Sequence, residues 1–256
     1  MSNWAGDITI GLGWVYYDGP VGHTQFHQHY AVQVCFPFSG PLHVETHKNN
    51  HRVEGVLVVG SNVSHRLSTP SPTAKLLYIE PNLIRSNTKK LIVDEIEVLD
   101  IPASQLKAIE QTLDHYPKLA QADFGLNLAR LIWPEEGEHT DFSAIDPRIQ
   151  QSLADIDATE DLNISLSQIV SSSGLSASRF RHLFSAQIGM PFKSYLLWIK
   201  LQRAFQSLAS DSSLTRAAHI AGFSDSSHLS RTFKRTFGLT PADLNKNAHF
   251  TTRKRG

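Results

Sequence analysis

The chain has 256 residues, which is enough for about two domains, each with its own hydrophobic core. Residues 1–145 carry 10 Lys and Arg against 16 Asp and Glu, a net charge of −6, whereas residues 146–256 carry 14 against 8, a net charge of +6. Only the C-terminal part therefore suits a polyanion such as nucleic acid. The chain has a single cysteine, Cys35, which excludes an intrachain disulfide and a cysteine-rich zinc site. It has no long apolar run and no signal peptide, so we expect a cytoplasmic protein without a membrane span.

Residues 8–81 are predicted to form short strands, because β-like segments alternate with turns such as Gly19-Pro20 and Gly40-Pro41. This pattern favours a barrel or a sandwich. Residues 53–59 form an almost continuous apolar run and are predicted to be one buried strand. In a predicted strand over residues 26–36, period two separates an apolar face from a small, polar face. The apolar face holds Tyr30, Val32, Val34 and Phe36, and the polar face holds His27, His29, Ala31, Gln33 and Cys35.

After Pro102 the apolar residues recur at helical spacing, which predicts an α-hairpin. Its first helix is marked by Leu106, Ile109 and Leu113, and its second by Leu126, Leu128, Leu131 and Ile132. The hairpin either provides a dimer surface or covers the strands. Residues 135–145 are polar and acidic and are interpreted as a linker, so that residues 1–134 and 146–256 form the two domains.

The C-terminal part contains the same helical pattern twice. Asp146-Pro147 caps a leading helix, Ser165 then caps a short helix, Gly174 makes a turn, and Ser176 caps an amphipathic helix that reaches Ile188. This order is typical of a helix-turn-helix.

The second unit follows after a joining helix over residues 191–208, which would be about 25 Å long. A short helix from Leu214 ends at Gly222, Ser224 is the expected N-cap of the next helix, and Gly238 ends it. The buried face of this last helix carries Leu229, Phe233 and Phe237. Two helix-turn-helix units at this separation can place helices in successive major grooves, about 34 Å apart, so the repeat predicts DNA binding.

The segments GFSDSSHLSRTFKRTFGLTP (222–241) and GLSASRFRHLFSAQIGMPFKSYL (174–196) resemble the AraC/XylS family of bacterial transcription regulators. The resemblance covers residues 146–245 and departs from the family pattern at Lys200 and Asn245, where arginine is usual, and at Val170, where a small residue is common. It implies an α+β fold of two domains, with a cupin-like β-barrel and α-hairpin before an all-α double helix-turn-helix.

The resemblance also implies which side chains face DNA. Base edges would be contacted by Ser178, Arg181, His182, Ser185, Ser227, His228 and Arg231. Arginine pairs with guanine O6 and N7, which makes Arg181 and Arg231 the strongest candidates for base recognition. Phosphate contacts are expected from Lys193, Lys200, Lys234 and Arg235, and the basic tail Arg253-Lys254-Arg255 is expected to be disordered.

The N-terminal part resembles the cupin-like effector domain of this family through His27, His29, Gln33 and His65. Metal-binding cupins place three histidines and a glutamate in this arrangement, and Gln33 stands at the position of the glutamate. These four residues are predicted to line an effector pocket without a cofactor; a metal held by His27, His29 and His65, or a purely structural polar cluster, are the alternatives. Trp14, Tyr16 and Phe26 either line the pocket or belong to the core, and His43, His47 and His51 are interpreted as solvated residues of a hairpin.

The function expected from these features is a transcription regulator and not an enzyme. Its partners would be double-stranded DNA, a small-molecule effector, RNA polymerase and a second copy of the chain in a homodimer. The alternative is a metal-dependent cupin enzyme or metal sensor fused to a DNA-binding domain. A DNA alkyl-repair protein is disfavoured because that chemistry needs a cluster of cysteines, and Cys35 stands alone.

Overall fold

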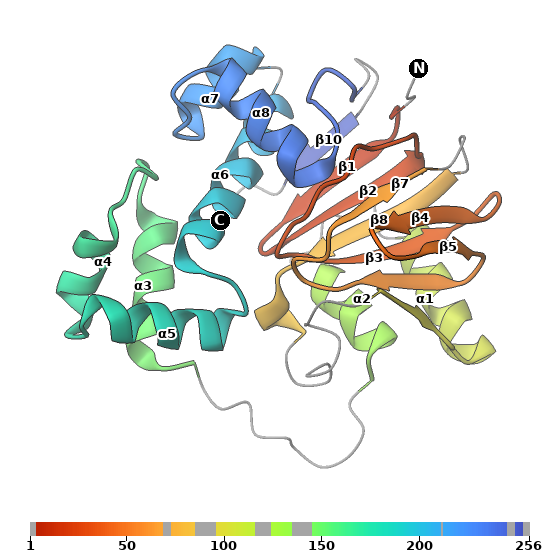
Figure 1. Cartoon of the computed structure of the whole chain (residues 1–256), viewed down its shortest axis with the longest axis horizontal. Helices are drawn as coiled ribbons and strands as arrows, with labels where there is room; N and C mark the ends of the chain where they lie inside the picture. The colour runs from red at the N-terminus through yellow and green to blue at the C-terminus, as the bar shows by residue number, and fades with distance from the viewer. Residues whose placement is uncertain are drawn as a thin grey trace.

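The structure is a computed structural model that describes residues 4–68, 73–84, 96–115, 124–134, 145–210, 212–244 and 249–252. Nearly all of the expected linker, together with Asn245 and the basic tail, lies outside the described residues. Two parts are visible in Figure 1: a sheet-rich N-terminal part, and a helical C-terminal part that packs against it.

The N-terminal part contains two sheets. The larger sheet has the strand order β10-β1-β2-β8-β3-β6-β9 and consists of β1 (Asp7–Gly11), β2 (Trp14–Pro20), β3 (Val32–Pro37), β6 (Val56–Val59), β8 (Thr73–Ile79), β9 (Ile96–Leu99) and β10 (His249–Thr252). The smaller sheet has the order β5-β4-β7 and consists of β4 (Leu42–Thr46), β5 (Asn50–Val53) and β7 (His65–Leu67). Neither sheet closes on itself within the described strands, so the structure shows a sheet-rich domain and not the closed barrel that the sequence favoured.

The central strands β2, β3, β6 and β8 of the seven-stranded sheet are buried on both faces, and period two decides which residue enters which layer. In β2, Trp14 and Tyr16 enter the layer beneath helices α1 (Ala103–His115) and α2 (Phe124–Ile132), whereas Val15 and Tyr17 enter the opposite layer. Trp14 and Tyr16 are therefore core residues and do not line an effector pocket. Figure 1 shows α1 and α2 together on one side of the sheet, away from the C-terminal helices.

The apolar side chains of the α-hairpin cover one face of the large sheet. Ile109, Leu113 and Leu128 are fully buried in the same layer as Trp14 and Tyr16, and Leu106 and Leu131 pack against its rim. The covering role that the sequence left open is thus confirmed, and the buried side chains are not free to form a dimer surface. The side chain of Leu126 lies outside the described residues.

The C-terminal part forms the six expected helices, and most of their ends agree with the sequence signals. The helices are α3 (Pro147–Ala158), α4 (Leu166–Ser173), α5 (Ala177–Ile188), α6 (Phe192–Leu208), α7 (Leu214–Ile220) and α8 (Ser226–Phe237). Asp146, Ser165 and Ser176 accept hydrogen bonds from the backbone at the starts of α3, α4 and α5. Gly174 and Gly222 adopt the left-handed conformation, with φ of 66° and 74°, in the turns of the two units.

Three expectations about local structure are wrong. The N-cap of α8 is Asp225, and not Ser224, because the Asp225 carboxylate accepts from the backbone N–H of His228. The run 53–59 is broken by a bend at residues 54–55, which separates β5 from β6. The strand expected over residues 26–36 begins only at Val32, and the preceding residues form a loop that is tied to β7 by a bridge between His27 and His65.

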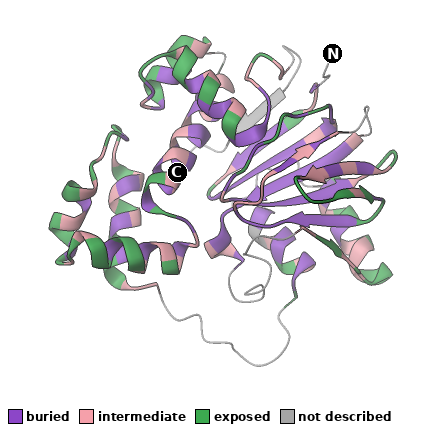
Figure 2. Cartoon of the chain, in the orientation of Figure 1, coloured by how far each residue is buried: buried purple, intermediate pink, exposed green. Residues whose placement is uncertain are grey.

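The C-terminal part is also not all-α. Strand β10 pairs in parallel with β1, so that a segment from the end of the chain extends the N-terminal sheet. Apolar residues of both parts form one continuous core, in which Tyr17 and Tyr78 of the sheet join Phe205, Phe233 and Phe237 of α6 and α8. Figure 2 shows these facing surfaces as buried, while the outer sides of α4, α5 and α8 are exposed.

Candidate DNA-binding surface and histidine cluster

The outer face of α5 carries the first group of expected DNA contacts. Phe180, Phe184 and Ile188 fix this helix by burying its inner face, and this leaves Ser178, Arg181 and His182 exposed and Ser185 half-buried. Arg179 is exposed on the same helix but was not among the residues expected to contact DNA. The exposed face of α5 can therefore offer arginine and histidine donors to a polyanion.

The outer face of α8 carries the second group. Leu229, Phe233 and Phe237 are buried, whereas Ser227, His228 and Arg231 are exposed and Lys234 is half-buried. The ring of His228 is held in place, because its Nδ1 lies 3.2 Å from the Ser224 hydroxyl and its edge packs on Phe223 with ring centroids 5.2 Å apart. Its Nε2 atom remains available for a ligand outside the protein.

Two of the expected phosphate-binding residues, Lys200 and Arg235, lie close to other groups of the protein. The Lys200 ammonium donates to Asn163 Oδ1 and to the Gly222 carbonyl, both at 2.8 Å, and partial burial lowers its pKa. Arg235 is exposed but lines a cavity of about 230 Å³ between the two parts of the protein, together with His29 and Trp198. Lys193 is exposed at the start of α6.

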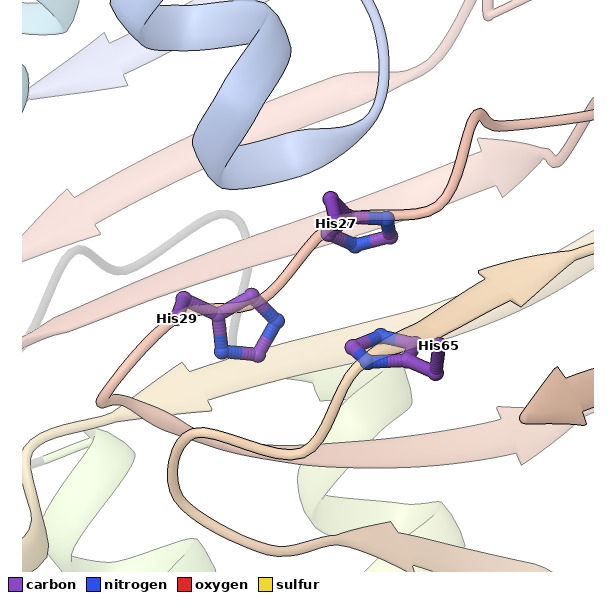
Figure 3. A group of neighbouring side chains, drawn as sticks. All are labelled: His27, His29 and His65. Atoms are coloured by element: carbon purple, nitrogen blue, oxygen red, sulfur yellow. The ribbon is translucent and has the colours of Figure 1, made fainter. Parts of the chain in front are cut away.

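The structure brings together three of the residues expected at the effector site. His27, His29 and His65 are buried, and one ring nitrogen of each lies within 4.8 Å of one ring nitrogen of the others. Figure 3 shows the three rings converging from the loop before β3 and from β7, below the end of α8. The ring centroids of His27 and His65 are 4.3 Å apart.

Backbone carbonyls determine which nitrogen of each ring carries the proton. His27 Nδ1 donates to the Gln25 carbonyl at 2.9 Å, His29 Nδ1 to that of Ala31 at 2.8 Å, and His65 Nδ1 to that of Val63 at 2.9 Å. A carbonyl oxygen can only accept, so each Nδ1 holds a hydrogen and each Nε2 holds a lone pair when the ring is neutral. Burial favours this neutral form, because it lowers the pKa of His27 to about 3 and also lowers the pKa values of His29 and His65.

Gln33 completes the cluster from β3. Its Oε1 atom lies 3.1 Å from both His29 Nε2 and His65 Nε2, and its amide nitrogen donates to Cys35 Sγ at 3.2 Å. His27 Nε2 is buried and has no hydrogen-bond partner in the part of the chain that the structure describes. The polar face that period two assigned to the segment before and within β3 thus supplies two neutral imidazoles and an amide to this buried group, and His65 of β7 supplies the third imidazole.

The other aromatic and histidine residues lie outside this cluster. Phe26 is 37% exposed and stacks on His47, with ring centroids 4.4 Å apart. His47 is exposed, and His43 and His51 are half-buried on the hairpin of β4 and β5. The interpretation of these histidines as hairpin residues agrees with their positions.

A contact between the two parts of the protein was missed from the sequence. Trp198 Nε1 on α6 donates at 3.0 Å to Glu80 Oε1, next to the 3-10 helix η1 (Pro81–Leu83). Burial raises the pKa of Glu80 to about 7, and the hydrogen bond from Trp198 opposes this shift only in part. No sequence signal could have found the pair, because the two residues are far apart in the chain and neither belongs to a motif.

Comparisons with known proteins agree with this architecture. Residues 169–247 match the model of a helix-turn-helix domain. The transcriptional activator NphR of Rhodococcus is 32% identical over 155 residues, which cover 59% of this chain and 43% of the relative. The transcriptional activator RhrA of Rhizobium meliloti is 29% identical over 138 residues, which cover 53% of this chain and 40% of the relative. The chain therefore spans about two fifths of the length of these relatives.

The fold as a whole is similar to that of ToxT from Vibrio cholerae, with a TM-score of 0.58 and 10% sequence identity over 91% of this chain and 97% of ToxT. A ToxT structure with a bound unsaturated fatty acid gives the same TM-score over 92% of this chain. The fold defines a protein with a sheet-rich N-terminal domain and a helical domain of two helix-turn-helix units. These matches agree with the resemblance to the AraC/XylS family that the sequence motifs carry. None of the helices in the described ranges combines the length and the apolar character needed to cross a membrane.

Proposed function

We propose that this chain is a sequence-specific DNA-binding transcription regulator whose activity is controlled by a small effector bound in its N-terminal domain. The observation that carries this proposal is the pair of exposed polar faces on α5 and α8, each with an arginine beside a histidine or serine on a helix fixed by its apolar side. The C-terminal part also carries the positive net charge that a polyanion requires.

We assign the exposed faces of α5 and α8 to base recognition, and the neighbouring Lys193 and Lys234 to phosphate contacts. Arg181 and Arg231 have the reach and donor geometry to pair with guanine in the major groove, and His182 and His228 can donate or accept beside them. Lys193 and Lys234 would contact phosphates and position the domain without reading sequence. Lys200 is omitted from this set, because protein oxygens already occupy two of its donors.

Control by an effector is supported by the contact between the domains. Gln25 donates its backbone N–H to the carbonyl of Gly238 at 2.8 Å, directly after α8, and Tyr78 packs edge-on against Phe237 at the end of the same helix. A ligand that rearranges the polar cluster beside Gln25 and Tyr78 would therefore alter the position of α8. We further infer a cupin-like arrangement of the N-terminal strands, action in the cytoplasm, and RNA polymerase and a homodimer as further partners.

Recovery of genomic fragments with the tagged full chain tests the proposal. We expect a shared motif that spans two adjacent major grooves, and binding of the best fragment that exceeds that of a shuffled fragment by about 10³-fold or more at fixed salt. Binding that salt abolishes equally for both fragments would overturn sequence-specific recognition.

A further inference from the structure

Helices α5 and α8 end in the same way, at a glycine in the left-handed conformation. Gly189 follows α5 with φ of 81°, and Gly238 follows α8 with φ of 73°. The N–H of each glycine donates to a carbonyl four residues earlier, that of Ser185 at 3.0 Å and that of Lys234 at 2.8 Å. Left-handed glycines are common at the ends of helices, so this conformation alone needs no contact with another domain.

The N-terminal domain nevertheless packs directly against both of these glycines. A Cβ atom at Gly189 would lie 2.6 Å from the Cβ of Pro81, the first residue of η1. A Cβ atom at Gly238 would lie 2.5 Å from the carbonyl oxygen of Gln25, in the loop before β3. Because Cβ atoms do not approach other heavy atoms this closely, a side chain at either glycine would force the two domains apart at that point.

The turn glycines inside the two units behave differently. Gly174 and Gly222 have similar φ values, 66° and 74°. A Cβ atom at Gly174 would meet no heavy atom of the described residues within 4 Å, and one at Gly222 would first meet the Lys200 side chain, at an ordinary distance of 3.4 Å. Among these four glycines, the close approach of the N-terminal domain is thus confined to the two that end α5 and α8.

The same domain also holds the joining helix α6 between these two points. Trp198 Nε1 donates to Glu80 Oε1 at 3.0 Å, and Glu80 directly precedes Pro81. At the end of α8, Gln25 donates its backbone N–H to the Gly238 carbonyl at 2.8 Å. The N-terminal domain therefore contacts the first unit, the joining helix and the second unit, and Figure 1 shows these three elements along one side of the sheet-rich part.

We propose that the N-terminal domain fixes the separation of α5 and α8 through Gly189 and Gly238, and so determines which spacing between the two groove contacts one chain accepts on DNA. This inference rests on the proposed function. One base pair added between the two contacts shifts the second groove by about 3.4 Å and rotates it by about 34°. Two units that only α6 connects can follow this change by a small rotation, whereas units that a second domain holds at both ends cannot. The two glycines are positioning residues, because they act through the helices that they end.

Opening of the domain contact is measured on the full chain without DNA. Gly238→Ala adds a methyl group where Gln25 leaves no room, whereas the matched control Gly174→Ala puts alanine in the same left-handed conformation without a close neighbour. We expect the amide of Gln25 to exchange its hydrogen about threefold faster or more in Gly238→Ala, and at the wild-type rate in Gly174→Ala. Equal exchange in the two variants would show that the glycine contact does not hold the domains together, and would overturn the proposal.

The accepted spacing is measured on the best DNA fragment and on two versions of it, with one base pair added or removed between the groove contacts. The wild type and Gly174→Ala should lose about tenfold or more in affinity for either altered version. Gly189→Ala and Gly238→Ala should lose about threefold or less, because their units can follow the changed spacing. A wild type that tolerates both altered versions, or glycine variants that discriminate as strongly as the wild type, would contradict the proposal.

A further variant covers the case in which an added methyl group prevents folding. Trp198→Phe removes the hydrogen bond to Glu80 without adding a side chain or straining the backbone. It should relax the spacing preference in the same direction, and circular dichroism checks that each variant is folded. Unchanged discrimination by folded Trp198→Phe and by the folded glycine variants would overturn the role of the domain contact. Failure of the proposed function is distinguishable, because the wild type would then show no preferred fragment at any spacing.

Discussion

Lys200 illustrates how a residue with an expected phosphate contact can bind groups of the protein instead. Its sequence position, where the related family has arginine, suggests a phosphate contact. In the structure its ammonium joins Asn163, before α4, to Gly222, in the turn between α7 and α8. The sequence could not predict this role, because the two acceptors come from segments that only the tertiary fold brings together.

Replacement of Lys200 by methionine should therefore act on stability and not on phosphate binding. We expect Lys200→Met to lower the free energy of unfolding by about 1–2 kcal/mol, discounted for partial exposure, because two oxygens lose a charged donor. The slope of log affinity against log salt should stay close to that of the wild type. Lys193→Met, on an exposed residue of the same helix, should reduce that slope by about one and leave stability unchanged. Urea unfolding and salt titrations of DNA binding measure both effects, and the reverse assignment would contradict this account.

Elements whose signals are local could be predicted well. Ser165, Gly174 and Ser176 work through neighbouring backbone groups, so their roles as caps and turn could be derived from the sequence alone. The same holds for the apolar stripes of α5 and α8. Errors arose where two local signals compete, as at Ser224 and Asp225, which are both good capping residues.

The start of α8 depends on the Asp225 carboxylate. Asp225→Ala should lower the Tm by roughly 2–5 °C and weaken the proposed DNA binding, because the first turn of α8 loses the acceptor for its free N–H groups. Ser224→Ala should change the Tm less, since its hydroxyl contacts side chains and does not cap the helix. Asp225→Asn should keep the Tm close to that of the wild type, because the amide oxygen can still accept from the backbone N–H of His228. Thermal unfolding of the three variants measures the difference, and a larger effect at Ser224 would refute the assignment.

At the scale of the whole molecule, the joint core of the two domains is the feature that the sequence did not predict. Composition and the acidic segment 135–145 indicated separate domains, yet β10 pairs with β1 and Trp198 reaches Glu80. Contacts between residues that are distant in sequence leave no periodic pattern. The histidine cluster was found from the sequence because its members fit a family arrangement, but its proximity to Gly238 was not.

Glu80 makes this joint core sensitive to pH. Its pKa is about 7 in the folded chain against 4.5 for an ordinary glutamate, because of burial first and of the negative charge of Asp157 in addition. Between these two values the folded state binds more protons than the unfolded state, so this group lowers the free energy of unfolding as pH rises from about 4.5 to 7. The full change between the two pKa values is roughly 3 kcal/mol.

Glu80→Gln should remove this dependence, since the amide oxygen can still accept from Trp198 and carries no titrating proton. The free energy of unfolding of the variant, relative to the wild type, should therefore increase by roughly 1–3 kcal/mol between pH 5 and pH 8. Urea unfolding at both pH values provides the measurement. A difference between variant and wild type that is the same at both pH values would show that Glu80 titrates normally.

The central proposal is that α5 and α8 each recognise bases at a different position of the DNA site. A series of base substitutions in the best DNA fragment tests it most directly. The series is measured with the wild type, Arg181→Ala, Arg231→Ala and Lys234→Ala at fixed salt. Each arginine variant should lose about 1–3 kcal/mol of preference at its own base position, and the two positions should lie about one helical turn apart. Lys234→Ala should weaken binding to all fragments alike. Arginine variants that behave like Lys234→Ala, with every base preference retained, would contradict base recognition by α5 and α8.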